Sequence, residues 1–314
     1  MSSPRRAVID VGTNSIKLLV AEVVRGQVTP VLEESRQTRL GKGFYPAHVL
    51  QQGPINESAL AIAEFARRAA DLGVEHPRVV ATSAMREAYN RDALVAAVEQ
   101  SCALPIRIIS GEEEADYAFR GVTSDPRFKS DPLVILDVGG GSTEFILGQG
   151  ERKHFAMSFK IGTVRLLEQA HPSDPPTVEQ LATCRKTVRE FLEKEVGPSL
   201  KSALARESGP GRAVQLVGTG GTASVLGCLE CRLTAFDRER LESTPLGRDR
   251  VSWHAERLWS MPLDQRRNIP GLPSNRADVI LTGTAIFEGI MACFDFNQLR
   301  ISTRGLRFAV VLED

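Results

Sequence analysis

The chain has 314 residues, which is enough for two domains of ordinary size, each with its own hydrophobic core. Its 39 basic and 39 acidic residues cancel, so neither nucleic acid nor an anionic membrane surface is expected as a partner. No stretch reaches the roughly 20 apolar residues that a membrane span requires, and five cysteines are too few for a disulfide framework. With a start that leads directly into a strand pattern, these features predict a cytoplasmic protein.

Strand and helix patterns alternate along the chain, which predicts an α/β fold with mixed sheets. Strands are expected at 6–11, 16–24, 28–40, 78–84, 106–110, 133–138, 143–149, 154–161 and 213–218. Helices are expected at 57–72, 90–103, 112–122, 177–205, 249–260 and 276–294. Proline, aspartate and serine interrupt the pattern at residues 123–132, which predicts a linker there.

The first candidate for anion binding is the segment IDVGTNSIKLLVAE, residues 9–22, which predicts a β-hairpin with a tight turn. Thr13, Asn14 and Ser15 form its tip, where small side chains and backbone amides can hold a phosphate. Asp10 ends the first strand, and Lys17, in the second strand, is expected to bind phosphate by its charge.

Two further segments of the first half carry charge. Arg86, in SAMREA, follows a predicted strand, where its guanidinium can bind phosphate through two hydrogen bonds; a surface salt bridge is the alternative. Glu112, Glu113 and Glu114 begin the helix expected at 112–122. On the residues alone, this run is explained as a solvated first turn, because helix starts favour negative charge.

The segment LDVGGGSTEFILGQ, residues 136–149, repeats the first hairpin without a gap. Asp137 aligns with Asp10, whereas Glu144 stands where the first copy has Lys17. The repeat therefore predicts two similar domains that face each other across a cleft, with one catalytic centre and a metal ion on one wall only. Bare glycine amides form an anion cradle. The expected phosphate-binding positions of this copy are Gly139, Gly140, Gly141, Ser142 and Thr143.

A third loop, VGTGGTAS at residues 217–224, follows a strand and leads into a helical pattern, which predicts an anion site at a helix N-terminus. The CxxC of Cys228 and Cys231 lies in the apolar stretch that follows. No second pair stands at zinc-finger spacing, which favours helix packing over a metal or redox role. The expected phosphate-binding residues of this loop are Gly218, Thr219, Gly220, Gly221 and Thr222.

In their order, these segments resemble the exopolyphosphatase/guanosine pentaphosphate phosphohydrolase (Ppx/GppA) family. The resemblance covers essentially the whole chain and rests on the two DxGxxS hairpins, ATSAMREA, IISGEEEADYAFRGV, GTGGT and STRGLRFAVV. It implies the fold shared by actin, sugar kinases and heat-shock chaperone ATPases, with two ribonuclease-H-like domains around a cleft. The domains would span 1–124 and 125–303, and a last helix at 304–314 would pack back on the first domain.

The resemblance also implies the chemistry. A water molecule would attack a terminal phosphate and release orthophosphate from inorganic polyphosphate or from pppGpp, with Mg²⁺ or Mn²⁺ as cofactor. Glu114 matches the family's general base, whereas Asp137 and Glu144 match residues that hold the metal and order the water. Asp10, the counterpart of Asp137, is expected to share the metal. Arg276 matches a motif that lines the second domain and is expected to bind phosphate.

Several functions fit these residues. Polyphosphate is preferred over pppGpp because the sequence shows no distinct purine pocket. A non-catalytic sensor of polyphosphate or guanosine tetraphosphate is an alternative of another class, although a sensor would not need Glu114 and Glu144. A sugar or acetate kinase is a third, and the acid-rich GEEEA argues against it. A homodimer is a family-level expectation, and two anion loops on opposite walls predict domain closure around the substrate.

Overall fold

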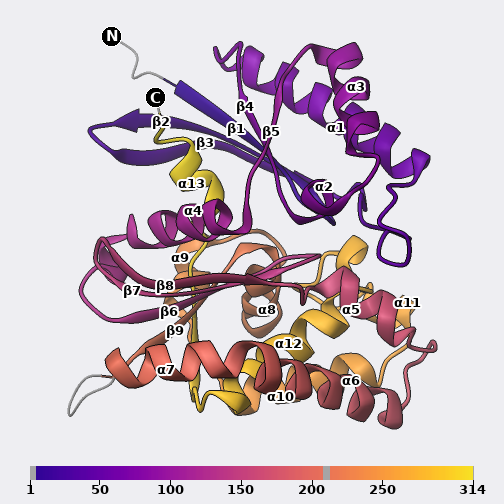
Figure 1. Ribbon diagram of the computed structural model, residues 1–314, viewed down its shortest axis with the longest axis vertical. Coiled ribbons are helices and arrows are strands. Elements are labelled where there is room, and N and C mark those ends of the chain that lie inside the picture. Colours follow the sequence, from indigo (N-terminus) through magenta and orange to yellow (C-terminus); the bar gives the residue numbers. More distant parts are fainter. Residues whose placement is uncertain (1–4, 208–212, 314) are drawn as a thin grey trace.

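The computed structural model describes residues 5–207 and 213–313, which fold around two mixed β-sheets (Figure 1). The first sheet has the strand order β3-β2-β1-β4-β5. β1, β2 and β3 are antiparallel, whereas β4 and β5 continue the sheet in parallel with β1. Its strands are β1 (Arg5–Val11), β2 (Ile16–Val24), β3 (Gln27–Arg36), β4 (Arg78–Ala81) and β5 (Ile106–Ile108).

Successive side chains of a strand point to opposite faces of a sheet. Both faces of the first sheet carry apolar side chains, and helices cover both. α1 (Gln52–Asp71) and α3 (Arg91–Cys102) pack on the face that carries Ile9 and Leu18. α4 (Gly111–Thr123) and α13 (Leu306–Val310) pack on the opposite face, which carries Val8 and Leu19. The last helix of the chain thus lies against β1.

The second sheet has the strand order β10-β11-β9-β6-β7-β8. β6, β9 and β11 run parallel, and β6, β7 and β8 form an antiparallel meander. The hairpin β6–β7 thus occupies the place in this sheet that β1–β2 occupies in the first, as the repeat predicts. The strands are β6 (Leu133–Val138), β7 (Thr143–Gln149), β8 (Arg152–Phe159), β9 (Gln215–Thr219), β10 (Leu246–Gly247) and β11 (Gln298–Ile301).

α4 lies between the two sheets (Figure 1). Its Tyr117 packs with the core of the first sheet, and its Phe119 packs with Ile135 and Ile146 of the second. The helix begins at a capping box, in which Ser110 and Glu113 each bond the other's backbone amide. Packing on both sides therefore fixes the N-terminus of α4 in the space between the halves.

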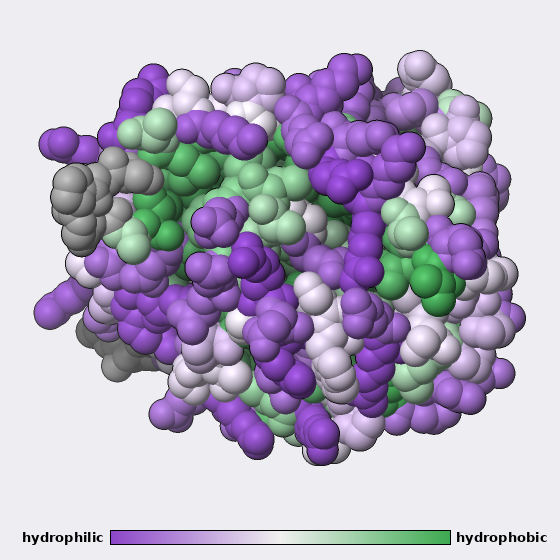
Figure 2. Space-filling view, turned by 90° about the horizontal axis from the view of Figure 1, so that it is seen from below, coloured by the Kyte–Doolittle hydropathy of each residue, from purple (hydrophilic) through white to green (hydrophobic). Residues whose placement is uncertain are grey.

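The remaining helices belong mainly to the second half. α6 and α10 pack on α12 beneath the second sheet. Figure 2 shows the molecule from this side: the face is largely hydrophilic, with apolar side chains gathered in separate patches. Of the helices in the described ranges, none is long and apolar enough to cross a membrane. The helices are α2 (Ser83–Glu87), α5 (Thr163–Ala170), α6 (Val178–Phe191), α7 (Gly197–Glu207), α8 (Gly220–Cys231), α9 (Arg238–Ser243), α10 (Arg248–Trp259), α11 (Leu263–Arg266) and α12 (Ile280–Cys293).

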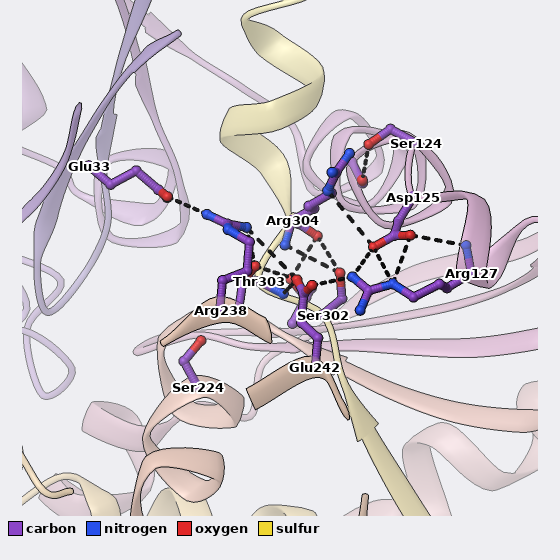
Figure 3. A network of polar contacts seen from close by, with 12 residues as sticks. Glu33, Ser124, Asp125, Arg127, Ser224, Arg238, Glu242, Ser302, Thr303 and Arg304 are labelled. Carbon is purple, nitrogen blue, oxygen red and sulfur yellow. Dashed lines mark hydrogen bonds and ion pairs between the residues drawn. The ribbon is translucent and has the colours of Figure 1, made fainter. Parts of the chain in front are cut away.

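The chain passes between the halves after α4 and again between β11 and α13, and a polar network joins these two crossings (Figure 3). Glu242 of α9 accepts hydrogen bonds from the backbone and the hydroxyl of Thr303, at the second crossing. It also pairs with Arg127, which binds Asp125 at the first crossing. Arg238 of α9 pairs with Glu33 of β3, so the network reaches the first sheet.

The sequence patterns predict the α/β class and most of the long elements, but they miss the short ones. The sequence predicts no strand where β10 and β11 lie, because β10 has only two residues and the apolar residues of β11, QLRI, are separated by an arginine, so neither forms an apolar run. The short helices α5, α9 and α11 were also not predicted. Residues 83–84, expected to end a strand, begin α2 instead.

The expected ends of several elements also differ from the structure. The strand expected at 28–40 ends at Arg36, and the last helix spans Leu306–Val310 rather than 304–314. The helix expected at 276–294 begins at Ile280, after a 3-10 turn. The helix expected at 177–205 is interrupted by a π-helical turn between α6 and α7. Local pattern alone does not fix such ends, because caps and tertiary contacts decide them.

Candidate active site

The turns of the two hairpins lie face to face and have the same backbone geometry. The amide of Gly12 donates to the carbonyl of Ser15 over 3.1 Å, and the amide of Gly139 donates to the carbonyl of Ser142 over 3.0 Å. A Cβ atom added to Gly140 would lie 2.8 Å from Cβ of Thr13, so the turns approach each other too closely for larger residues. They enclose a chamber of about 70 Å³.

In each turn, backbone carbonyls accept hydrogen bonds from a segment that lies outside the chamber. In the second hairpin, the amide of Thr163, in the first turn of α5, donates to the carbonyl of Gly139, and the amide of Val164 donates to that of Gly140. The N–H and C=O groups of a trans peptide point in opposite directions. The amides of Gly140 and Gly141 therefore point away from α5, and both residues line the chamber.

In the first hairpin, backbone amides also bind the carbonyls of the turn, but they belong to a loop rather than to a helix. The loop after β3 supplies the amides of Arg39 and Gly41, which donate to the carbonyls of Asn14 and Thr13 over 3.1 and 2.7 Å. The amides that follow these carbonyls, those of Asn14 and Ser15, therefore point away from that loop, and both residues line the chamber. Two sets of backbone donors thus converge from opposite walls, an arrangement suited to a phosphate group.

The two walls of the chamber differ in the charges that they carry. Asp10 and Lys17 are cross-strand partners in the first hairpin, with Nζ 3.5 Å from Oδ2. Asp137 and Glu144 hold the same register in the second, where two carboxylates lie side by side. Glu144 is 1% exposed and accepts a hydrogen bond from Ser158 over 2.7 Å. Burial, and then the charge of Asp137, raise the pKa of Glu144 to about 7.

Burial also raises the pKa of Asp137, and the charge of Lys17 opposes this. Carboxylates so close together in a buried site favour a cation between them. In the described part of the chain, no group of three or more His, Cys, Asp or Glu side chains makes a complete metal site. Mg²⁺ does not need one, because it binds through one or two carboxylates together with waters and substrate phosphates. Asp137, which lines the chamber together with Asp10, and its cross-strand partner Glu144, which lies behind the chamber lining, offer the one or two carboxylates that such a cation needs.

Of the three acids that begin α4, only Glu114 faces the chamber. Glu112 is exposed, and Glu113 belongs to the capping box. Glu114 is 8% exposed and lies 3.0 Å from Nη1 of Arg86. Burial, followed by the charge of Glu144, raises the pKa of Glu114, and Arg86 opposes this rise. A buried carboxylate in a cleft, with its pKa raised by desolvation, has the properties of a general base.

Arg276 brings a positive charge to the chamber without a matching acid. Its side chain is half-buried, and desolvation lowers its pKa. Within residues 5–207 and 213–313, its hydrogen-bond partner is the hydroxyl of Ser15, 3.3 Å from Nη2. Partial desolvation of a guanidinium without a carboxylate partner is costly, so this position favours a bound anion.

A larger cavity of about 670 Å³ adjoins the chamber and shares with it Asp10, Lys17, Asp137, Gly221, Arg276 and Leu306. Its charged residues lie at this shared inner end, where Arg307 also contributes. The outer part is mainly apolar, and Phe236 in its wall is 59% exposed. The apolar lining of this part includes Val225, Leu233, Ala235, Phe236, Pro270 and Leu272.

Some residues expected to bind phosphate lie behind the chamber walls. Gly218 is within β9, where an added Cβ would meet Ala223 and Phe287. The hydroxyl of Thr219 donates to the carbonyl of Arg304, and that of Thr143 donates to the carbonyl of Ile161. Their side chains thus support the loops from behind. Gly220, Gly221 and Thr222 do line the two cavities.

A sequence model of the Ppx/GppA phosphatase family matches residues 19–314. The chain belongs to this family. As a Ppx/GppA protein it is an enzyme, a hydrolase of the exopolyphosphatase and guanosine pentaphosphate phosphohydrolase type. This finding rules out the two other functions that fitted the sequence, a kinase and a non-catalytic sensor.

Two relatives illustrate the two branches of the Ppx/GppA family. Exopolyphosphatase 2 of Mycobacterium tuberculosis is 35% identical over 300 residues, which cover 92% of this chain and 90% of that protein. The guanosine-5'-triphosphate,3'-diphosphate pyrophosphatase of Vibrio cholerae is 29% identical over 314 residues, which cover 100% of this chain and 60% of that protein.

Solved structures of Ppx/GppA proteins confirm the fold. The Aquifex aeolicus PPX-GPPA enzyme is 28% identical, with a TM-score of 0.77 and 99% of both chains covered. An exopolyphosphatase from Cytophaga hutchinsonii is 24% identical, with a TM-score of 0.85 and with 98% of this chain and 96% of that chain covered. The prediction of a two-domain actin-like fold is confirmed.

Sequence reasoning missed three residues that lie in or behind the site. Ser83 lines the chamber, Ser158 bonds Glu144, and Arg165 is buried behind the glycine turn. Ser83 stands in the same SAMREA segment as Arg86, which is a signal that could have found it. Arg165 is the single charge in the apolar run TVRLL, and a lone charge at a buried helical position is such a signal too.

Proposed function

We propose that this hydrolase releases the terminal orthophosphate of inorganic polyphosphate by water attack in the chamber between the two hairpins. The observation that carries the proposal is the convergence of two opposed amide cradles, a half-buried arginine without an acidic partner in the described residues, and the buried Glu114 on one small space. The name of the mycobacterial relative, an exopolyphosphatase, supports polyphosphate as the substrate class.

In this mechanism the chain positions the reactants and stabilises charge. Glu114 accepts the proton of the attacking water, and Arg86 holds its carboxylate in place. The hairpin amides, Lys17 and Arg276 bind the oxygens of the transferred phosphoryl group, on which charge develops. Mg²⁺ or Mn²⁺, held by Asp137 and Glu144 with Asp10, would supply further positive charge beside the phosphate.

A second candidate substrate is pppGpp, and the larger cavity favours it. Cations lie at the inner end of this cavity, whereas its outer walls are mainly apolar. A polyphosphate chain would be served by cations along its whole path, whereas a nucleoside would occupy apolar walls next to a charged phosphate site. The Vibrio cholerae relative is named for hydrolysis of such a nucleotide.

Release of orthophosphate from each substrate tests the proposal. The purified chain is incubated with Mg²⁺ and either polyphosphate or pppGpp, and kcat/KM is determined for both. We expect polyphosphate to be hydrolysed with the higher kcat/KM, and EDTA to abolish release. A higher value for pppGpp would replace the first substrate by the second, and no release from either would overturn the proposal.

A variant of the cavity wall separates the substrates further. Phe236→Ser removes an exposed aromatic ring from the outer part of the larger cavity. If a nucleoside binds there, KM for pppGpp should rise by about tenfold, as for the loss of one aromatic contact, while hydrolysis of polyphosphate stays unchanged. Equal effects on both substrates would argue that this wall does not bind a nucleoside.

A further inference from the structure

We propose that Arg165 is a positioning residue that aims the amides of the glycine turn into the chamber and ties them to the helix that carries Arg86. The inference rests on the proposed function, because it concerns how the same chamber is aligned. Arg165 belongs to α5, behind the second hairpin, and is 9% exposed.

One end of Arg165 holds the glycine turn. Its backbone amide donates to the carbonyl of Gly140 over 3.1 Å, and its Nε donates to the carbonyl of Gly141 over 2.8 Å. Because the carbonyl of Gly141 points to Arg165, the following amide, that of Ser142, points the opposite way. Ser142 lines the chamber. The backbone of α5 thus binds the carbonyls of Gly139 and Gly140, and the side chain of Arg165 binds the next carbonyl of the turn, that of Gly141.

The other end of Arg165 reaches across the cleft to the first half. Its Nη2 donates to Oε1 of Glu87 over 2.6 Å, and the hydroxyl of Ser83 donates to the same oxygen over 3.1 Å. Ser83 and Glu87 belong to α2, whose next-to-last residue is Arg86, the partner of Glu114. Arg165 therefore connects one amide cradle directly to the short helix that positions the proposed general base.

Only a guanidinium fits this place. It is planar and donates from Nε and Nη2 in fixed directions, so it can join Gly141 and Glu87 at once. Its face lies on Tyr45 of the first half, with Cζ 4.1 Å from the ring centre. A lysine would keep an ion pair with Glu87, but its single point charge would not hold the carbonyl of Gly141 in the same geometry.

This arrangement predicts an effect on kcat rather than on KM. Lys17 and Arg276, which lie on other elements, would still bind the substrate. Misdirected amides would stabilise the transition state less, because their distance to the developing charge decides their effect. Glu168 of the same helix separately accepts hydrogen bonds from the backbone of Gly43 and Tyr45, so α5 keeps a contact with the first half.

The test compares Arg165→Met and Arg165→Lys with the control Arg185→Met. Arg185 makes two hydrogen bonds to Glu288, far along the chain from the site, and its loss should leave kcat unchanged. We expect kcat for phosphate release to fall about 10²-fold in Arg165→Met, with KM nearly unchanged. Arg165→Lys should recover the thermal stability of the wild type but only part of its kcat, which a purely structural role would not produce.

Two further measurements complete the test. Glu87→Gln combined with Arg165→Met should reduce kcat no further than Arg165→Met alone, because both act through one contact. Binding of orthovanadate, measured by calorimetry, reports on the amide cradle without turnover and should weaken in Arg165→Met but not in Arg185→Met. Unchanged kcat and unchanged vanadate binding in Arg165→Met would overturn the inference. An inactive wild type whose vanadate binding still depends on Arg165 would overturn the proposed function alone.

Discussion

Burial distinguishes Glu114 from the two acids that precede it in the sequence. Glu112 is exposed, Glu113 caps α4, and Glu114 lies in the chamber against Arg86. The residues alone could not separate these three, because the start of a helix favours all of them. The family resemblance selected Glu114, and its place beside the chamber depends on how α4 packs between two sheets, which a local pattern does not contain.

The acid limb of the pH profile tests the contact between Arg86 and Glu114. A general base acts when it is deprotonated, so activity should fall as the pH drops through the raised pKa of Glu114. In Arg86→Met the carboxylate loses the positive charge that favours its ionised form, so the pKa of Glu114 rises further.

The acid limb of kcat/KM in Arg86→Met should therefore move to higher pH, by about one unit or more. Arg107→Met is the control, because Arg107 pairs with Glu113 outside the chamber, and its limb should stay in place. If the acid limb of kcat/KM does not move in Arg86→Met, or moves to lower pH, the assigned contact between Arg86 and Glu114 is contradicted.

At the scale of elements, the sequence repeat predicted the two hairpins and their turns, because the signal lies within a few consecutive residues. It did not predict how the turns are oriented. Their carbonyls are bound by α5 and by the loop at 39–41, both more than twenty residues from the turns they support. The sequence also placed Gly218 among the phosphate-binding residues, whereas this glycine serves the close packing of β9.

Gly141→Ala tests the close approach of the two walls. The added Cβ would lie against the hydroxyls of Ser83 and Tyr45, on the first half of the molecule. Because displacement of the amide cradle by about 1 Å is enough, kcat/KM for phosphate release should fall about 10²-fold. Gly53→Ala is the matched control: no atom lies near its added Cβ, so activity should be kept and stability should rise by up to about 1 kcal/mol. Full activity of Gly141→Ala would show that the walls do not need to meet.

At the scale of the whole molecule, the repeat predicted two similar halves, and in both sheets the expected hairpin lies among the interior strands. The junction between the halves could not be predicted, because Glu33, Asp125, Glu242 and Thr303 come from four distant segments (Figure 3). The division of the chain at residue 124 stays a prediction, since α4 packs with both sheets.

Glu242→Gln tests the junction. The side chain of Glu242 is buried and binds Thr303 of one crossing and Arg127 of the other, so its neutral replacement leaves charged and polar partners unsatisfied. The free energy of unfolding, measured with urea, should fall by about 2 kcal/mol. Glu190→Gln, whose partner Lys186 lies on the same exposed helix face, should cost less than about 0.5 kcal/mol. Equal losses of unfolding free energy in the two variants would show that the junction does not stabilise the fold.

In the proposed mechanism, Glu114 activates the water that attacks the terminal phosphate. Single-turnover release of orthophosphate from polyphosphate, with binding measured in parallel, tests it most directly in Glu114→Gln against Glu112→Gln. Glu112→Gln should behave as the wild type, because this acid is exposed at the same helix start. Glu114→Gln should bind polyphosphate normally and release phosphate about 10²- to 10⁴-fold more slowly. Release at the wild-type rate in Glu114→Gln would contradict the claim.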